Sequence, residues 1–210
     1  MGLTWYQDSL KEKFKSNFKP KDGERFDVVI VGGGLAGLSL LTFLAEAGIN
    51  SLLIDSNEIG IGASGRNGGF CSPGWSQGYE HLLKSYNLEL VKELDYISSQ
   101  GLAWMKMKCT EKAFATANYK EGIVSCFLNG NVANAEQKLN KNNKIFDTDH
   151  KFLPRDELAN IIASKRYLFG VKLTNGFHFH PLNFMKLLAK ECVKKGGKIS
   201  EECSLVDYKK

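Results

Sequence analysis

Residues 60–70, GIGASGRNGGF, combine five glycines with three side chains that form strong hydrogen bonds. Glycine has no Cβ, so such a backbone can lie close against a flat, phosphorylated ligand. The side chains and peptide N–H groups could bond to its phosphate, sugar and ring atoms, and the arginine could pair with a pyrophosphate or a carboxylate. A flexible surface loop is the alternative. The candidate binding residues in this stretch are Ser64, Arg66, Asn67, Gly68 and Gly69.

A second glycine pattern lies upstream, between a predicted strand and a predicted helix. Residues 28–31 are Val-Val-Ile-Val, a β-branched run typical of strands that are buried on both faces. Gly32, Gly34 and Gly37 follow as G-x-G-x-x-G. The first glycine permits the tight turn, the second lets the backbone approach a pyrophosphate, and the third lets the helix pack on the strand. A helix predicted over residues 38–47 would offer its N-terminus to that phosphate.

Asp55 follows directly after a second predicted strand, residues 51–54. It lies eighteen residues beyond Gly37, where a dinucleotide-binding unit places a carboxylate against the ribose hydroxyls. A carboxylate there, in place of a basic group, argues against a 2′-phosphate. An NAD-binding unit would continue into an amphipathic helix, and residues 60–70 have no such pattern. The pattern favours FAD, with an NAD-dependent dehydrogenase as the less favoured alternative.

Composition narrows the class of protein. The 210 residues carry a net charge of +5, but the lysines are scattered and do not form the clustered stripe expected of a nucleic-acid surface. Residues 28–45 are uncharged, yet their glycines at one turn argue against a membrane span. Five cysteines without a C-x-x-C pair favour a reducing compartment over a disulfide framework or a zinc site. We therefore expect a cytoplasmic protein that does not bind nucleic acid and has no membrane span.

The segments DVVIVGGGLAGLSLLTFLAEAG (27–48) and LLIDSNEIGIGASGRNGGF (52–70) resemble the N-terminal half of the D-amino-acid oxidase-like FAD-dependent oxidoreductases. The S-G-R-N-G-G form is similar to the branch that contains gamma-glutamylputrescine oxidoreductase. The resemblance implies an α/β fold, with a Rossmann-type FAD-binding domain of the glutathione-reductase type and part of an α+β substrate domain. It also implies that the enzyme oxidises a C–N bond of a small amine or amino acid.

The resemblance further implies a domain organisation. In this family, backbone at the position corresponding to Leu205 meets the adenine, within a strand predicted over residues 204–208. Family members continue past residue 210, so the chain resembles an N-terminal portion, and a noncatalytic, truncated flavin-binding module is the alternative function. The expected parts are an N-terminal extension (1–25), a FAD-binding Rossmann part (26–110), a partial substrate domain or insertion (111–176) and a return to the FAD-binding domain (177–210).

Other reactive side chains are expected to be structural. Some relatives attach FAD through a histidine near the glycine-rich loop; residues 65–67 contain none, so noncovalent FAD is expected. Cys71, just after the loop, is expected to be a packed side chain. His178 and His180 fit a strand-to-helix junction better than a metal site, and residues 147–150 fit a polar loop. No catalytic residue is assigned.

Overall fold

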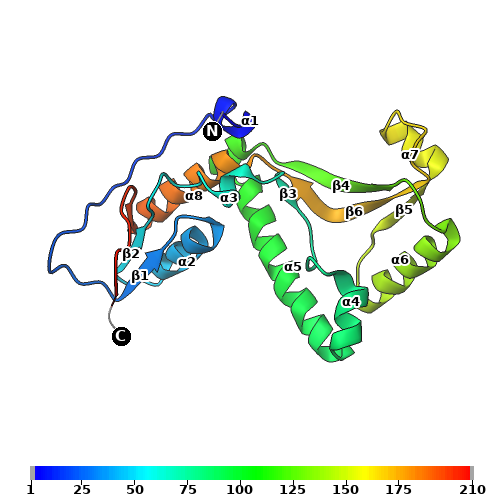
Figure 1. Ribbon diagram of the computed structural model, residues 1–210, viewed down its shortest axis with the longest axis horizontal. Coiled ribbons are helices and arrows are strands. Elements are labelled where there is room, and N and C mark those ends of the chain that lie inside the picture. The colour runs from blue at the N-terminus through cyan, green and yellow to red at the C-terminus, as the bar shows by residue number, and fades with distance from the viewer. Residues whose placement is uncertain (1–2, 209–210) are drawn as a thin grey trace. The chain divides into compact units, whose positions relative to one another are not determined.

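The computed structural model describes residues 3–208, which form two compact units (Figure 1). The first unit contains the chain up to Gly69, then 111–118, then the chain from Phe179 onward; the second contains 70–110 and 119–178. These limits differ from the predicted boundaries. Residues 70–110 belong with the second unit, and 111–118 join the first because Phe114 packs against Phe184, with ring centroids 5.4 Å apart.

The first unit is built on a three-stranded parallel sheet of the order β1-β2-β7. Its strands are β1 (Val28–Val31), β2 (Ser51–Ile54) and β7 (Lys198–Ser200), and the crossover helices are α2 (Leu35–Glu46) and α8 (Pro181–Lys194). Figure 1 shows α2 beside β1 and β2. Parallel strands joined through helices are the Rossmann arrangement, which confirms the predicted fold class.

The core of the first unit lies between the sheet and its two helices. Thr42 of α2 lies 3.0 Å from Cys192 of α8, measured from Oγ1 to Sγ, and both residues are buried. In β1, Ile30 is buried, whereas Val29 and Val31 are 49% and 59% exposed. The prediction that β1 is buried on both faces is therefore wrong, because a β-branched run specifies an extended backbone but does not supply a covering layer.

An N-terminal arm, residues 9–18, covers one edge of this sheet after the short helix α1 (Trp5–Asp8). The Phe18 N–H donates to the Ile199 carbonyl (3.2 Å), and the Ile199 N–H donates to Asn17 Oδ1 (2.9 Å). β7 therefore has partners on both sides, β2 and the arm. The sequence predicts an N-terminal extension here but not its pairing with β7. An irregular segment that pairs through its backbone shows no periodic pattern of apolar residues.

The second unit is an antiparallel sheet with β6 (Phe169–His178) at its centre, flanked by helices. β6 pairs with all three other strands and so joins both segments of the second unit in one sheet. These are β3 (Phe70–Cys71), β4 (Lys120–Phe127) and β5 (Lys151–Pro154). The helices are α4 (Gly78–Ser85), α5 (Leu88–Thr110), α6 (Val132–Phe146) and α7 (Arg155–Ile161).

None of the helices between residues 3 and 208 combines the length and apolar character needed to span a bilayer.

Candidate functional site

The glycine turn between β1 and α2 has the geometry that its spacing predicts. Gly32 has φ of +111°, a backbone conformation that favours glycine. A Cβ at Gly37 would lie 2.0 Å from the Gly32 carbonyl oxygen, so only glycine allows the helix this close to the turn. Gly34 is the N-cap of α2 and carries no capping side chain. The N-terminus of a 12-residue helix therefore opens directly at the turn.

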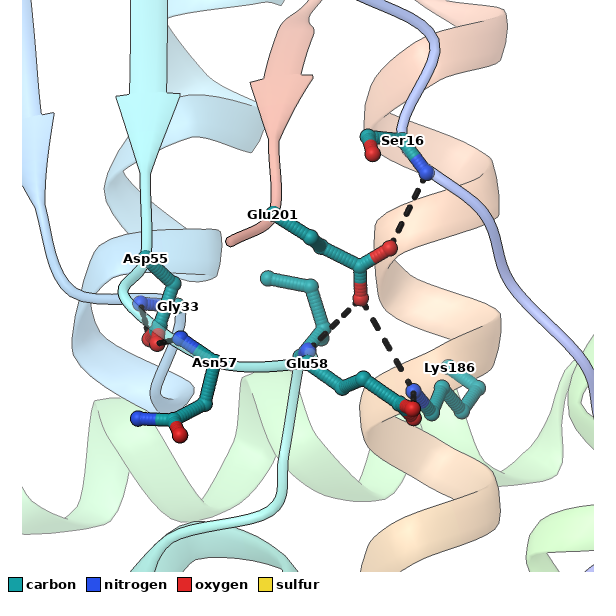
Figure 2. Close-up of polar contacts among 8 residues, drawn as sticks. Ser16, Gly33, Asp55, Asn57, Glu58, Lys186 and Glu201 are labelled. Atoms are coloured by element: carbon teal, nitrogen blue, oxygen red, sulfur yellow. Dashed lines mark hydrogen bonds and ion pairs between the residues drawn. The ribbon is translucent and has the colours of Figure 1, made fainter. Parts of the chain in front are cut away.

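Asp55 lies next to this turn, at the end of β2 (Figure 2). Its Oδ2 accepts a hydrogen bond from the Gly33 N–H at 2.6 Å, and its Oδ1 accepts one from the Asn57 N–H at 2.8 Å. These bonds fix the carboxylate. Each carboxylate oxygen has a second lone pair, so the group can still accept from a ligand hydroxyl.

A pocket forms where the turn, Asp55 and the following loop meet; we name it the turn pocket. Its volume is about 210 Å³. Of the predicted site residues, Gly34, Asp55 and Ser64 line it together. Ser64 Oγ accepts from the Leu35 N–H at 3.0 Å and keeps its own hydrogen as a donor. The lining residues are Gly33, Gly34, Asp55, Asn57, Gly60, Ile61, Gly62, Ala63 and Ser64.

The rest of the glycine-rich stretch has more structure than the loop expected from its sequence. Residues 63–66 form a single helical turn, α3 (Ala63–Arg66). Asn67 closes it, because its Nδ2 donates to the Ser64 carbonyl (2.9 Å) and its Oδ1 accepts from the Gly69 N–H (2.8 Å). Asn67 and Gly69 thus bond to each other here. Gly68 and Arg66 are exposed, and these four residues do not line the turn pocket.

The strand predicted over residues 204–208 is wrong. In the part of the chain that the structure describes, this segment has no strand partner, and Leu205 and Val206 are 49% and 95% exposed. Glu202, with φ of +54°, turns the backbone out of the extended path that β7 follows. The Cys203 N–H still donates to the Asp55 carbonyl at 2.8 Å, so the segment starts beside the site.

Sequence reasoning missed a buried charged pair, Glu201 and Lys186, whose carboxylate contacts the loop that follows β2. Glu201 follows β7 directly, and its carboxylate accepts from the Ile59 N–H at 2.7 Å. Lys186 lies in α8, and its side chain is 5% exposed. A lysine within the apolar stretch LNFMKLLA was the available signal, because a buried lysine requires a partner.

The other reactive side chains have structural surroundings. His180 is the N-cap of α8, with its Nδ1 accepting from the Asn183 N–H at 3.1 Å. Burial raises the pKa of the Cys71 thiol to about 11, which keeps it protonated at neutral pH. Between residues 3 and 208, no group of three or more His, Cys, Asp or Glu side chains could hold a metal ion.

The comparison with known families decides which dinucleotide fold this is. Residues 27–210 match the family model described as "DAO: FAD dependent oxidoreductase". The chain belongs to this family of FAD-dependent oxidoreductases. The family match confirms the resemblance drawn from the sequence and favours FAD over NAD.

Curated relatives of this chain include bacterial proteins. A probable oxidoreductase OrdL of Haemophilus influenzae is 30% identical, over 97% of this chain and 47% of the relative. The gamma-glutamylputrescine oxidoreductase of Escherichia coli is 28% identical, over 83% of this chain and 41% of the relative. The chain spans about half the length of the curated relatives it matches.

Solved structures share the fold. Glycine oxidase from Bacillus cereus superposes with a TM-score of 0.63 and 23% identity, over 88% of this chain and 48% of that chain. L-Amino acid deaminase from Proteus myxofaciens superposes with a TM-score of 0.66 and 20% identity, over 92% and 42% of the two chains. At these identities the likeness establishes the fold alone.

Proposed function

We propose that this chain provides the FAD site of a longer enzyme that oxidises a C–N bond of an amine or amino acid. The observation that carries the proposal is the meeting of Gly34, Asp55 and Ser64 around the turn pocket, at the N-terminus of α2. A helix N-terminus favours a phosphate, and a carboxylate at the end of the second strand favours ribose hydroxyls. These are two chemical features of FAD.

The residues divide between the parts of the cofactor. Gly32, Gly34 and Gly37 form the turn for the pyrophosphate, and Asp55 accepts from the ribose. The backbone at Leu205 serves the adenine. Three side chains and two peptide N–H groups of the glycine-rich stretch serve the phosphate and flavin side: Ser64, Arg66, Asn67, Gly68 and Gly69. The Asn67–Gly69 bond would have to open for both residues to serve in this way.

Noncovalent attachment of FAD fits the same residues. The glycine-rich stretch contains no histidine. Partial burial raises the pKa of the Cys71 thiol to about 11, and a protonated thiol is a weak nucleophile. A flavin released intact by acid or heat denaturation, with no flavin left on the precipitated protein, is the expected outcome.

The proposed substrate class is supported by the names of several relatives. Once bound, FAD supplies the acceptor for the electrons removed from the substrate, while the protein orients the reacting groups. The relatives and structural neighbours named above are a gamma-glutamylputrescine oxidoreductase, a glycine oxidase and an L-amino acid deaminase. These names describe amines and amino acids, which supports a small substrate whose C–N bond is oxidised.

All five cysteines are free, which supports a reducing, cytoplasmic location.

Binding is tested by titrating FAD into the purified protein and into Asp55→Ala. The variant removes the proposed ribose acceptor, so its dissociation constant should rise by about tenfold or more, as expected for a lost charged hydrogen bond. Asp22→Ala, an exposed aspartate in a turn, is the matched control and should bind as the parent protein does. Equal affinity of both variants would reject Asp55 as a cofactor ligand.

The reaction class is tested by mixing the longer enzyme that contains this chain, loaded with FAD, anaerobically with amines, amino acids and hydroxy acids. Bleaching of the flavin absorption by amines or amino acids alone is expected. Bleaching by hydroxy acids alone would contradict C–N oxidation. Flavin that binds but is bleached by no substrate would favour the noncatalytic, flavin-binding alternative.

A further inference from the structure

Glu201 connects three segments of the first unit (Figure 2). One carboxylate oxygen, Oε1, accepts from the Ile59 N–H at 2.7 Å and lies 3.9 Å from Lys186 Nζ. The other, Oε2, accepts from the Ser16 N–H at 3.0 Å. The Glu201 side chain is 9% exposed, and that of Lys186 is 5% exposed. A single side chain after β7 therefore holds the N-terminal arm, the chain after β2 and helix α8.

The bond to Ile59 bears directly on the turn pocket. We name residues 57–62 the pocket loop, since Asn57 and residues 60–62 line that pocket. Ile59 lies in its middle, and its side chain is fully buried. It packs against the glycine turn, because a Cβ built on Gly33 would lie 2.2 Å from Ile59 Cδ1. Fixing the amide of Ile59 therefore fixes how closely the pocket loop approaches the turn.

The charge on Lys186 explains why a carboxylate stands at position 201. Lys186 is buried in α8, and Glu58 Oε2 lies 3.4 Å from its Nζ. The Glu58 side chain is 69% exposed, so its charge is screened by water and compensates the lysine weakly. Glu201 is the buried partner, and loss of one member of a buried pair leaves the other uncompensated.

We propose that Glu201 is a positioning residue for the cofactor site. It does not line the turn pocket; it acts through the Ile59 N–H, which sets the pocket loop against the glycine turn. Lys186 is the ion-pair partner of the Glu201 carboxylate, whereas the bond to the Ile59 N–H is made by Glu201 itself. The inference rests on the proposed function, since the site that Glu201 shapes is the proposed FAD site.

The test measures FAD affinity by flavin fluorescence for Glu201→Gln and Glu201→Asp. The glutamine has one acceptor oxygen for two N–H donors, and the aspartate keeps the charge for Lys186 but is shorter by one methylene. Both should raise the dissociation constant for FAD by about tenfold. Glu202→Gln, the same change at the exposed neighbour, should leave it unchanged.

A second variant separates positioning from simple stabilisation. Lys186→Met removes the cation but leaves both N–H bonds to Glu201, so FAD affinity should stay within about twofold of the parent value although the protein unfolds more easily. Lys194→Met, an exposed lysine of the same helix, is its control. A loss of affinity in Lys186→Met as large as in Glu201→Gln would overturn the role through Ile59.

Hydrogen exchange of the protein without FAD gives a readout that does not depend on the cofactor. The Ile59 and Ser16 amides should exchange faster in both Glu201 variants, while the β2 amides of residues 52–54 exchange as in the parent. Variants that bind FAD as tightly as the parent would refute the inference alone. A parent protein that binds no FAD would refute the proposed function, and with it this role of Glu201.

Discussion

At the scale of single residues, the site depends on close backbone approaches that side chains would prevent. Gly37 and Gly33 each face an atom that a Cβ would meet at 2.0 and 2.2 Å, respectively. In the first case the atom is a backbone oxygen, and in the second it is the end of the Ile59 side chain. A rotamer change of Ile59 can relieve the contact at Gly33, but no rotamer change moves the backbone oxygen at Gly37. We therefore expect Gly37 to be the less replaceable glycine.

Gly37→Ala should destabilise the first unit by about 1–3 kcal/mol, the usual cost of forcing atoms into a packed contact. Urea unfolding followed by circular dichroism measures this. Gly62→Ala is the control, because no atom lies within 4 Å of a Cβ there and its φ of −80° suits any residue. Equal unfolding midpoints for the two variants would show that α2 does not pack on Gly32 as described.

At the scale of elements, the N-terminal arm is tied to the body of the first unit by Glu12. Its Oε2 lies 2.5 Å from Lys190 Nζ in α8, and its Oε1 accepts from Thr116 Oγ1 at 2.5 Å. The hydrogen bond from Lys190 and, next, the one from Thr116 lower the pKa of the Glu12 carboxyl below its usual value of 4.5. Folding therefore favours the charged form of Glu12.

This shift predicts how stability depends on pH. Because the folded pKa is lower than the unfolded one, Glu12 stabilises the fold above about pH 4.5, and the contribution is lost as pH falls through the folded pKa. Glu12→Gln should therefore be less stable than the parent by about 1–2 kcal/mol at pH 7. Thermal unfolding across pH 3 to 8 measures the difference, with Glu202→Gln as control. A difference that persists undiminished at the acid end would contradict the assignment to the Glu12 charge.

Elements within one stretch of sequence could be predicted, and those that depend on distant partners could not. The strand, glycine turn, helix and Asp55 lie between residues 28 and 55, so spacing alone carries the information. Glu201 meets Ile59 across 142 residues, and no local pattern encodes that pairing. The strand expected over 204–208 failed for the same reason, since β-propensity supplies no partner strand.

At the scale of the whole molecule, the first unit has the strands and helices of a dinucleotide-binding fold. The family that the chain matches is one of FAD-dependent oxidoreductases. Val29 and Val31 remain exposed on β1, and the chain spans about half the length of its curated relatives. The residues proposed to bind the cofactor all lie within this chain. The choice of substrate depends on the longer enzyme and was open to prediction only through family resemblance.

FAD binding by the first unit is tested most directly by the absorption spectrum of the purified protein. The protein is incubated with FAD, desalted and scanned, in parallel with a sample incubated with NAD. We predict that the flavin bands are retained after desalting and that they are lost in Asp55→Ala. Circular dichroism reports whether each sample is folded. A folded parent protein that emerges from the column without flavin would contradict FAD binding by the first unit.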